Sequence, residues 1–370
     1  MENPKIAIVI GTKAELIKCM PIMRELQDEK IDYVFIHTGQ HPLKKACSDF
    51  GVKKPDYVLS KEPELTTKFW SKINNNSFFW NISMVFKIRK LIRKLKPKYV
   101  IYHGDTMTTA DAAIGTSKIF NPFGKTWHNV HLEAGLRSGS MLEPFPEEIS
   151  RRICSIFSDT LLAVSVLSEE NLKNSSTKGK IFRVGNSVID SVHIVKDIAR
   201  NLIPIKEKDF VLINVHRHEH LRSKEKMTRI VEILSAVKSD AIWPLHDNTK
   251  YHLEKYGLFD KVKSMNNIRI TPLTDYFTFV RYMDRCKYLI TDGGSIQEES
   301  LILKKPCVIL RNRTERQEGL KSGYNFLTKL DVKKSQKIIR DIESGKIKAT
   351  DYPNPYGEKG VSKKIVELLR

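Results

Sequence analysis

Cysteine is scarce in this chain. Five cysteines are scattered over 370 residues, and no two of them stand in a CxxC spacing. Disulfide frameworks and cysteine-based zinc sites need paired or closely spaced cysteines, so we expect neither. We expect a cytoplasmic protein whose thiols stay reduced. The five residues are Cys19, Cys47, Cys154, Cys286 and Cys307.

Long apolar runs and the familiar glycine-rich nucleotide motifs are missing as well. No apolar stretch approaches the roughly 18 residues of a membrane-spanning helix, so we expect no membrane insertion. We expect no cleavable leader, because the sequence enters a short apolar run at residues 6–10 without a preceding hydrophobic segment. The segment that follows, residues 11–18, matches neither GxGxxG nor GxxxxGK(S/T).

Positive charge is abundant instead, with a formal net charge of +20. The densest segment is residues 87–96, where apolar residues repeat every three or four positions. That spacing predicts an amphipathic helix whose charged face is solvated. A positive field also suits a small dianionic substrate, so the charge alone does not define a partner class.

Strand-like runs alternate with helical stretches in two sets. A chain of this length favours two domains, and strands separated by helices form parallel sheets. We therefore predict an α/β protein with two Rossmann-like domains, residues 1–185 and 186–354, with a helix in 355–370 returning to the first. Residues 74–77 read as an exposed loop. The predicted strands are 6–10, 33–37, 99–102 and 130–132, then 210–215, 241–245, 268–271, 288–291 and 306–310.

Polar clusters follow several of these runs. Ligands of open α/β sheets bind outside the carboxyl ends of the strands, so groups placed there are candidates for chemistry. This pattern indicates an enzyme with its active site in the cleft between the domains. The clusters are residues 11–15, 103–106, 131–137 and 291–295.

Two of the clusters suit an anionic ligand. Lys13 and Lys18 lie at the start of a predicted helix, where free amide groups favour phosphate. Residues 293–295, Gly-Gly-Ser, follow a strand and let backbone amides approach a pyrophosphate. Glu299 lies about one turn further on, where its carboxylate could accept hydrogen bonds from a ribose. A plain turn and a helix-capping carboxylate are the structural alternatives.

Three acids at strand ends or loops are candidates for proton transfer: Asp105, Glu133 and Glu147. Carboxyl groups in a cleft can act as acid and base when their environments differ. Each could instead cap a helix or pair with Arg137, Arg151 or Arg152.

His216 and Arg217 follow a strand of the second domain and complete this set. Residues 216, 218 and 220 are all histidine, but alternate positions after a strand are a weak metal signature. We expect no metal.

With these motifs in their order, the chain resembles the non-hydrolysing UDP-N-acetylglucosamine 2-epimerases. The resemblance covers both halves. It rests on residues 11–18 (GTKAELIK), 37–41 (HTGQH), 104–106 (GDT), 133–137 (EAGLR), 144–152 (PFPEEISRR), 185–190 (GNSVID), 216–217 (HR), 296–299 (IQEE) and 311–316 (RNRTER).

The resemblance implies the GT-B architecture, a homodimer, and an isomerase without metal or nicotinamide cofactor. It further implies that a base removes the C2 proton while UDP leaves C1, and that UDP then adds back to 2-acetamidoglucal. By position, Asp105, Glu133 and Glu147 would transfer protons and His216 would assist the diphosphate. Substrate contacts would come from Lys13, Lys18, Arg217, Phe279, Gly293, Gly294, Ser295, Glu299 and Arg311.

The sequence departs from the family pattern at several of these positions. Lys13 replaces an arginine fork with a point charge, which cannot make the same bidentate phosphate contact. Residues 292–295 permute the usual Asp-Ser-Gly-Gly. Gln40 and His246 match the region where a second UDP-GlcNAc binds as activator in bacterial members, whereas Leu43 does not.

Alternatives remain within the same fold. A hydrolysing 2-epimerase, an epimerase of a modified UDP-sugar and a GT-B glycosyltransferase would each look similar in sequence. The basic charge also permits nucleic-acid binding, although we expect a UDP-sugar ligand and no nucleic-acid partner.

Overall fold

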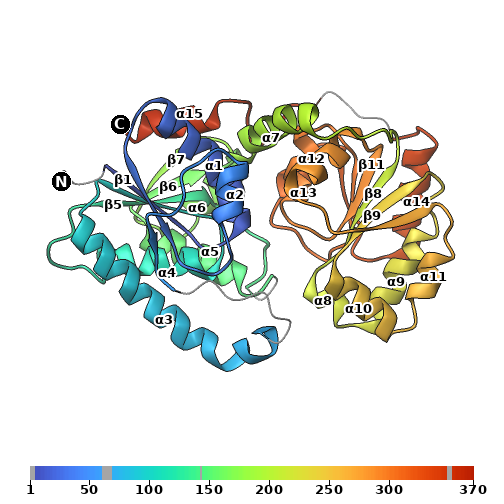
Figure 1. Cartoon of the computed structure of the whole chain (residues 1–370), viewed down its shortest axis with the longest axis horizontal. Helices are drawn as coiled ribbons and strands as arrows, with labels where there is room; N and C mark the ends of the chain where they lie inside the picture. The colour runs from blue at the N-terminus through green and yellow to red at the C-terminus, as the bar shows by residue number, and fades with distance from the viewer. Residues whose placement is uncertain (1–4, 61–68, 142–143, 348–351) are drawn as a thin grey trace. The chain divides into compact units, whose positions relative to one another are not determined.

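The computed structural model describes residues 5–60, 69–141, 144–347 and 352–370. The chain divides into a first unit, Met1–Ser191 with Tyr356–Arg370, and a second unit, Val192–Pro355. Each unit is built on its own parallel sheet with helices on both faces (Figure 1). The predicted α/β class with two Rossmann-like domains is confirmed.

The first unit holds a seven-stranded sheet in the order β3-β2-β1-β4-β5-β6-β7. All neighbours pair in parallel, and β1 is buried along its whole length, as expected for a strand covered by helices on both faces. The strands are β1 (Ile6–Ile10), β2 (Tyr33–His37), β3 (Tyr57–Val58), β4 (Tyr99–His103), β5 (His128–Ala134), β6 (Thr160–Ala163) and β7 (Lys180–Arg183).

Helices connect these strands, except for the last two of the unit, which lead into the second unit and form the C-terminal segment. They are α1 (Lys13–Asp28), α2 (Lys44–Asp49), α3 (Phe69–Leu95), α4 (Met107–Thr116), α5 (Glu147–Phe157), α6 (Val166–Lys173), α7 (Val188–Leu202) and α15 (Val361–Leu368). The loop predicted at 74–77 is wrong, because these residues lie inside α3. Asparagine costs a helix only about 0.7 kcal/mol per residue, which packing of the neighbouring turns overrides. Those turns bury Met84, Ile88 and Ile92 in the core of the first unit.

The second unit repeats the plan with six strands in the order β10-β9-β8-β11-β12-β13. Its core surrounds the fully buried Trp243. The strands are β8 (Val211–Asn214), β9 (Ala241–Leu245), β10 (Ile268–Pro272), β11 (Tyr288–Thr291), β12 (Cys307–Ile309) and β13 (Asn325–Leu327). The helices are α8 (His218–Leu221), α9 (Lys224–Leu234), α10 (Asp247–Lys255), α11 (Phe259–Lys263), α12 (Tyr276–Arg285), α13 (Ile296–Ile302), the 3-10 helix η1 (Gln317–Lys321) and α14 (Val332–Glu343).

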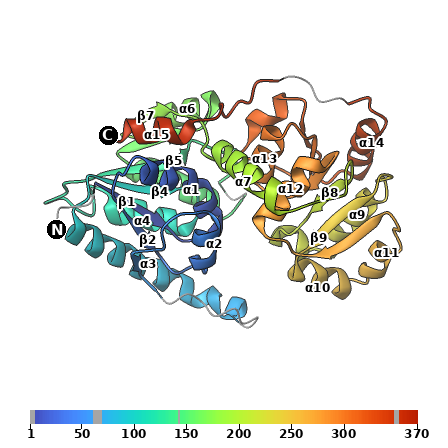
Figure 2. The same ribbon diagram turned by 45° about the horizontal axis from the view of Figure 1, so that its top comes forward.

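The C-terminal segment belongs to the first unit. Helix α15 packs on α1 (Figure 2), and Asp190 accepts hydrogen bonds from Gly360 N at 2.8 Å and Ser362 N at 2.7 Å. The boundary between the units falls between Ser191 and Val192, inside α7. No helix of the described ranges is long and apolar enough to cross a membrane.

Candidate active site

Both sheets have a topological switch point, where the chain leaves two neighbouring strands in opposite directions. In the first unit this point lies between β1 and β4, and in the second between β8 and β11. Crevices at the carboxyl ends of such strands are the usual ligand sites of this fold. The predicted site residues Asp105 and His216 lie two residues after the ends of β4 and β8, respectively.

The turn after β1 is closed by the buried carboxylate of Glu15, whose role is not evident from the sequence. Glu15 accepts hydrogen bonds from Gly11 N and Thr12 N, both at 2.7 Å, and forms a capping box with Thr12. Burial raises the pKa of Glu15, although these bonds oppose the rise. The amides expected to meet a phosphate are therefore already bonded to protein, while Lys13 is exposed.

Glu133 lies in β5 with a left-handed backbone, φ 58°, and its side chain is buried. Its Oε2 accepts from the ammonium of Lys18 and, at 3.1 Å, from Asn186 Nδ2. The structure thus differs from the expectation for Lys18, whose buried ammonium pairs with a carboxylate of the protein. A cation already neutralised in this way is a weaker phosphate ligand.

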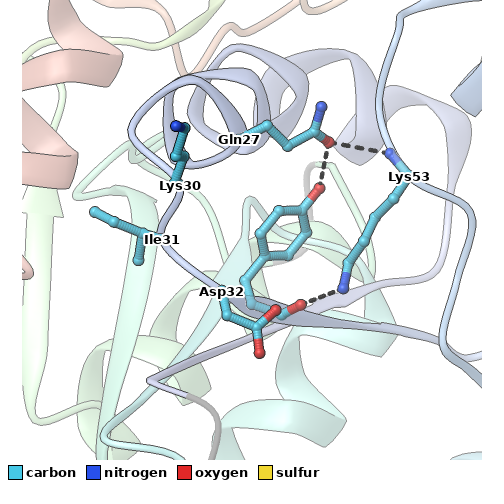
Figure 3. Close-up of a pocket in the computed structure, with 6 residues that line it drawn as sticks. Gln27, Lys30, Ile31, Asp32 and Lys53 are labelled. Atoms are coloured by element: carbon cyan, nitrogen blue, oxygen red, sulfur yellow. Dashed lines mark hydrogen bonds between the residues drawn. The ribbon is translucent and has the colours of Figure 1, made fainter.

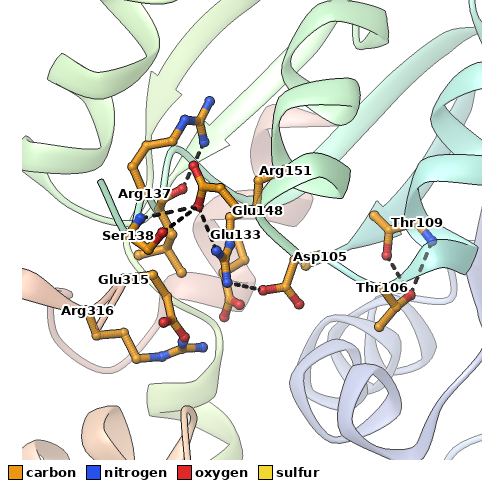
Figure 4. Close-up of polar contacts among 12 residues, drawn as sticks. Asp105, Thr106, Thr109, Glu133, Arg137, Ser138, Glu148, Arg151, Glu315 and Arg316 are labelled. Atoms are coloured by element: carbon orange, nitrogen blue, oxygen red, sulfur yellow. Dashed lines mark hydrogen bonds and ion pairs between the residues drawn. The ribbon is translucent and has the colours of Figure 1, made fainter. Parts of the chain in front are cut away.

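Asp105 is held from α5 by an arginine. Arg151 donates to Asp105 Oδ2 from Nη2 and to Glu148 Oε2 from Nη1, the latter at 2.9 Å (Figure 4). Glu148 is fully buried and also accepts from Ser138 N at 3.2 Å. Glu147, the first residue of α5, is half-buried. The sequence reading missed Glu148, although its i,i+3 spacing to Arg151 was a signal for pairing.

Two buried histidines flank these acids. Burial lowers the pKa of His103 and of His131 to about 4, so both rings are neutral near pH 7. His131 Nε2 donates to Gly104 O at 2.8 Å, and His103 Nε2 lies 3.8 Å from Glu133 Oε2. Positive charge next to Glu133 therefore comes from Lys18 and not from these imidazoles.

In the second unit, one carboxylate organises the loop after β8. Asp292 is fully buried and accepts from His216 N and Arg217 N, both at 3.0 Å, and from His220 Nδ1 at 2.9 Å. Burial alone would raise the pKa of Asp292, but the bonds from His220 and the backbone hold it below its ordinary value. Asp292 thereby fixes where the predicted His216 and Arg217 stand.

The weak metal reading of residues 216–220 finds no support in this geometry. His220 uses Nδ1 to bond Asp292, and His218 is exposed. Across the described ranges, no three His, Cys, Asp or Glu side chains gather as metal ligands would.

The Gly-Gly-Ser loop after β11 is closely surrounded by other side chains. A Cβ on Gly294 would lie 3.2 Å from Arg316 Nη1 and from Glu315 Oε1, and one on Gly293 would lie 2.9 Å from Ile296 Cδ1. Gly293 N is bonded to Thr291 Oγ1 at 2.9 Å. Ser295 is the N-cap of α13 and makes no capping bond with its side chain. Any larger residue at 293 or 294 would need its neighbours to shift.

The expected ribose and uracil contacts are Glu299 and Phe279. Phe279 lies on α12, and Tyr276 of the same helix bonds Glu299. Tyr276 donates its hydroxyl to Glu299 Oε1 at 2.8 Å, and burial raises the pKa of that phenol well above its ordinary value. Phe279 is one turn further along α12, half-buried. Residues three apart on a helix share a face, which brings Phe279 to the side of α12 that carries Tyr276.

Arg311 is placed in an ion-pair network and not at an open surface. Arg311 Nη2 donates to Glu315 Oε2 at 3.0 Å, and Arg316 contacts both Glu315 and Glu298. All four side chains are buried. Burial lowers the pKa of Arg311 below its ordinary value, which the Glu315 charge opposes. The guanidinium expected to bind substrate is thus neutralised by Glu315.

The two residues expected at an activator site lie in different units. Gln40 Oε1 accepts from Thr108 Oγ1 at 3.0 Å in the first unit. His246 is exposed in the second unit, where Nδ1 accepts from Asn248 N at 3.3 Å at the start of α10.

A shallow surface pocket lies elsewhere in the first unit (Figure 3). Gln27 Oε1 accepts from Tyr33 OH at 2.8 Å and from Lys53 N at 3.1 Å. Tyr33 begins β2, so this pocket is at the amino end of the strands, opposite the polar clusters. It contains no predicted site residue.

The whole chain is similar to proteins of known family. A model of the UDP-N-acetylglucosamine 2-epimerase family matches residues 24–370. A Methanococcus maripaludis protein described as a UDP-N-acetylglucosamine 2-epimerase homolog is 32% identical over 375 residues, which cover 99% of each chain. A crystal structure of the Methanocaldococcus jannaschii UDP-GlcNAc 2-epimerase in complex with UDP-GlcNAc and UDP is similar at a TM-score of 0.82. It shares 31% identity and covers 98% of this chain and 99% of that one. A Pseudomonas aeruginosa UDP-2,3-diacetamido-2,3-dideoxy-D-glucuronate 2-epimerase is 29% identical over 87% of this chain and 88% of its own.

Proposed function

Because the chain belongs to the UDP-N-acetylglucosamine 2-epimerase family, we propose that it interconverts UDP-GlcNAc and UDP-ManNAc without releasing the free sugar. The observation that carries the proposal is the placement of Asp105, Glu133 and Glu147 in three different environments of the first unit. Glu133 is buried against a lysine, Asp105 is partly exposed beside an arginine, and Glu147 begins a helix. Environments that differ separate the proton affinities of carboxyl groups, which acid and base roles require.

The reaction we assign has two halves. One carboxylate removes the proton at C2 while the C1–O bond breaks and UDP leaves with the bonding pair, giving 2-acetamidoglucal. A second carboxyl then returns a proton to the opposite face of C2, and UDP adds back to C1. We propose Glu133, whose carboxylate accepts from Lys18 and Asn186, as the base and the partly exposed Asp105 for proton return.

We assign the UDP moiety to the second unit. We propose that the backbone of Gly293 and Gly294 and the hydroxyl of Ser295 contact the diphosphate, together with His216 and Arg217 on the adjoining loop. Prepositioned amides and cations stabilise the charge that develops as UDP leaves. Glu299 is proposed for the ribose and Phe279 for the uracil. Lys13, which is exposed, is the remaining candidate phosphate contact of the first unit.

Proton NMR in deuterated water tests the assignment. Purified protein with UDP-GlcNAc should yield UDP-ManNAc that carries deuterium at C2. Free ManNAc and UDP would instead establish the hydrolysing class. If neither UDP-ManNAc nor free ManNAc is formed, the protein does not act on UDP-GlcNAc.

A second candidate is epimerisation of a modified UDP-sugar. The similarity to a UDP-2,3-diacetamido-2,3-dideoxy-D-glucuronate 2-epimerase favours it specifically. That substrate carries an additional carboxylate, which the net charge of +20 would tolerate. Deuterium incorporation with that sugar and not with UDP-GlcNAc would support this candidate.

We also propose a homodimer formed through α3. Phe79, Ile82 and Phe86 recur along one face of this helix and are 70%, 41% and 53% exposed. An exposed apolar stripe of this kind is typical of a protein interface. Phe86→Lys should convert the dimer to a monomer in sedimentation analysis, and a monomeric wild type would contradict the proposal.

For the cell, we propose a cytoplasmic location. All five cysteines lie in the described ranges, where they are buried and form no disulfide, as expected for a protein of a reducing compartment.

A further inference from the structure

One oxygen of Glu133 collects several groups from distant parts of the chain. Lys18 of α1 and Asn186, which lies just before α7, both donate to Oε2. His103 Nε2 is 3.8 Å from the same oxygen. The other oxygen, Oε1, is directed toward Gly104, because a Cβ built there would lie 3.9 Å from it. The side chain is therefore anchored through Oε2 with Oε1 directed to the end of β4.

Asn186 is itself oriented by the backbone. Its Oδ1 accepts from Val188 N at 3.1 Å, and this bond identifies Nδ2 as the atom that faces Glu133. Its backbone N donates to Tyr356 O at 2.9 Å. Asn186 is 1% exposed, so its amide exchanges little with water. The donor to Glu133 is thus held in one direction by bonds to two segments.

We propose that Asn186 is a positioning residue for the epimerisation, acting through Glu133. The inference rests on the proposed function and goes beyond it, because Asn186 need not touch the substrate. Its amide fixes the rotamer of Glu133 on a strained stretch of β5 and, with Lys18, stabilises the ionised carboxylate.

The charge balance around Glu133 sets the expected direction of any change. The titratable groups near it are Lys18, Glu15 and Cys19 of α1, His103 and Asp105 at the end of β4, and His131 of β5. His103 and His131 are neutral near pH 7, because burial lowers the pKa of each to about 4. Removing the Asn186 donor therefore disfavours the ionised form of Glu133, and an anion at position 186 disfavours it further.

Other contacts hold this region of the fold without the Asn186 amide. Ser187 Oγ donates to Lys18 O and Ser191 Oγ to Ile17 O, both at 2.7 Å. Asp190 binds the start of α15. Replacement of Asn186 is therefore expected to leave the packing of α7 on α1 in place.

The test compares Asn186→Ala and Asn186→Asp with a matched control, Asn129→Ala. Asn129 is an equally buried amide of the first unit, and its Nδ2 donates to Thr116 Oγ1 and Phe157 O instead. The readouts are kcat, KM and the pH profile of kcat for C2 deuterium incorporation with UDP-GlcNAc. Asn186→Asp keeps the Oδ1 acceptor for Val188 N, so its pH profile can be measured even if the alanine variant folds poorly.

For Asn186→Ala we expect kcat to fall about 10- to 100-fold with KM within about twofold. The acidic limb of the pH profile should move up by about one unit, and further in Asn186→Asp. Asn129→Ala should leave that limb in place. An unshifted limb in both Asn186 variants, or an equal shift in the control, would overturn the positioning role. A wild type that incorporates no deuterium would overturn the proposed function as well, whereas an active wild type with unshifted variants overturns this inference alone.

Discussion

The two units use the same sheet plan but place their charges differently. In the first unit the cations are bonded to acids of the candidate site, Lys18 to Glu133 and Arg151 to Asp105. In the second, the acids serve the loops: Asp292 fixes the backbone after β8, and Glu315 neutralises Arg311. Proton transfer needs carboxyl groups with tuned environments, whereas phosphate binding needs rigid backbone with amides and cations at hand. The same sheet plan therefore carries different charge arrangements in the two units, because the loops after the strands differ.

We expect the largest effect on activity from replacing a candidate acid of the first unit. Glu133→Gln and Asp105→Asn should each lower kcat by about 100- to 10,000-fold, because shape is retained and acid–base function is lost. C2 deuterium incorporation by NMR gives the rate, and a melting curve checks the fold. Glu169→Gln, at an ion pair with Lys173 on α6, is the control. Wild-type turnover in either variant would contradict the catalytic assignment at that position.

In the second unit, replacement of Asp292 should disturb the loop after β8 and lower the stability of the protein. Asp292→Asn loses a charged acceptor of several bonds, so we expect about 1–3 kcal/mol less stability and a raised KM for the UDP-sugar. The pKa of Asp292 is held below its ordinary value in the folded state, so its contribution is present above about pH 4 and fades as the pH falls through the folded value. Urea unfolding at pH 7 and pH 3 measures this. An undiminished difference at pH 3 would argue against the ionised carboxylate as the cause.

A smaller effect, on UDP affinity, is expected from substitution in the glycine loop. Gly294→Ala forces Arg316 and Glu315 to move by a few tenths of an ångström, so we expect UDP affinity to fall about 3- to 10-fold with little change in kcat. Calorimetric titration with UDP alone isolates the nucleotide contribution. A fall in kcat at unchanged UDP affinity would show that this loop acts in the proton chemistry instead.

The smallest effect on activity is expected from an acid that the chemistry does not use. Asp111 of α4 is buried, and burial raises its pKa to about 8. The wild type therefore loses stability as the pH rises from about 4 to 8, since only the unfolded chain ionises easily. Asp111→Asn does not titrate and should gain roughly 1–2 kcal/mol over the wild type between pH 6 and 8. Melting temperatures at both pH values test this, and a constant difference would contradict it.

Much of the fold could be predicted from the sequence because parallel strands buried on both faces read as apolar runs. Residues 6–10 and 33–37 coincide with β1 and β2, and the polar clusters follow strands as expected. The prediction lacks the strands β3, β6, β7 and β13 and the helical character of residues 74–77. A two-residue strand carries no period, and asparagine-rich segments read as loops when the tertiary packing of their helix is unknown.

The candidate site was predictable only in residue type. Asp105, Glu133 and His216 could be proposed because polar groups at strand ends have a known place in this fold. Asp292 lies in the predicted cluster 291–295, but its organising role is not evident from the sequence. Its partners His216 and His220 lie 76 and 72 residues away in sequence, and only pairing of β8 with β11 brings them together.

By itself, the sequence determined the apolar and polar periods, and with them the parallel strands, the crossover helices and the chemical groups at the strand ends. The tertiary structure alone decided which groups pair. Lys18 and Glu133 are 115 residues apart, so no local pattern could assign that lysine to a carboxylate rather than to a phosphate. Local backbone preferences act over a few residues, whereas the Coulomb energy of a buried pair depends on distance and burial, which exist only once the chain has folded.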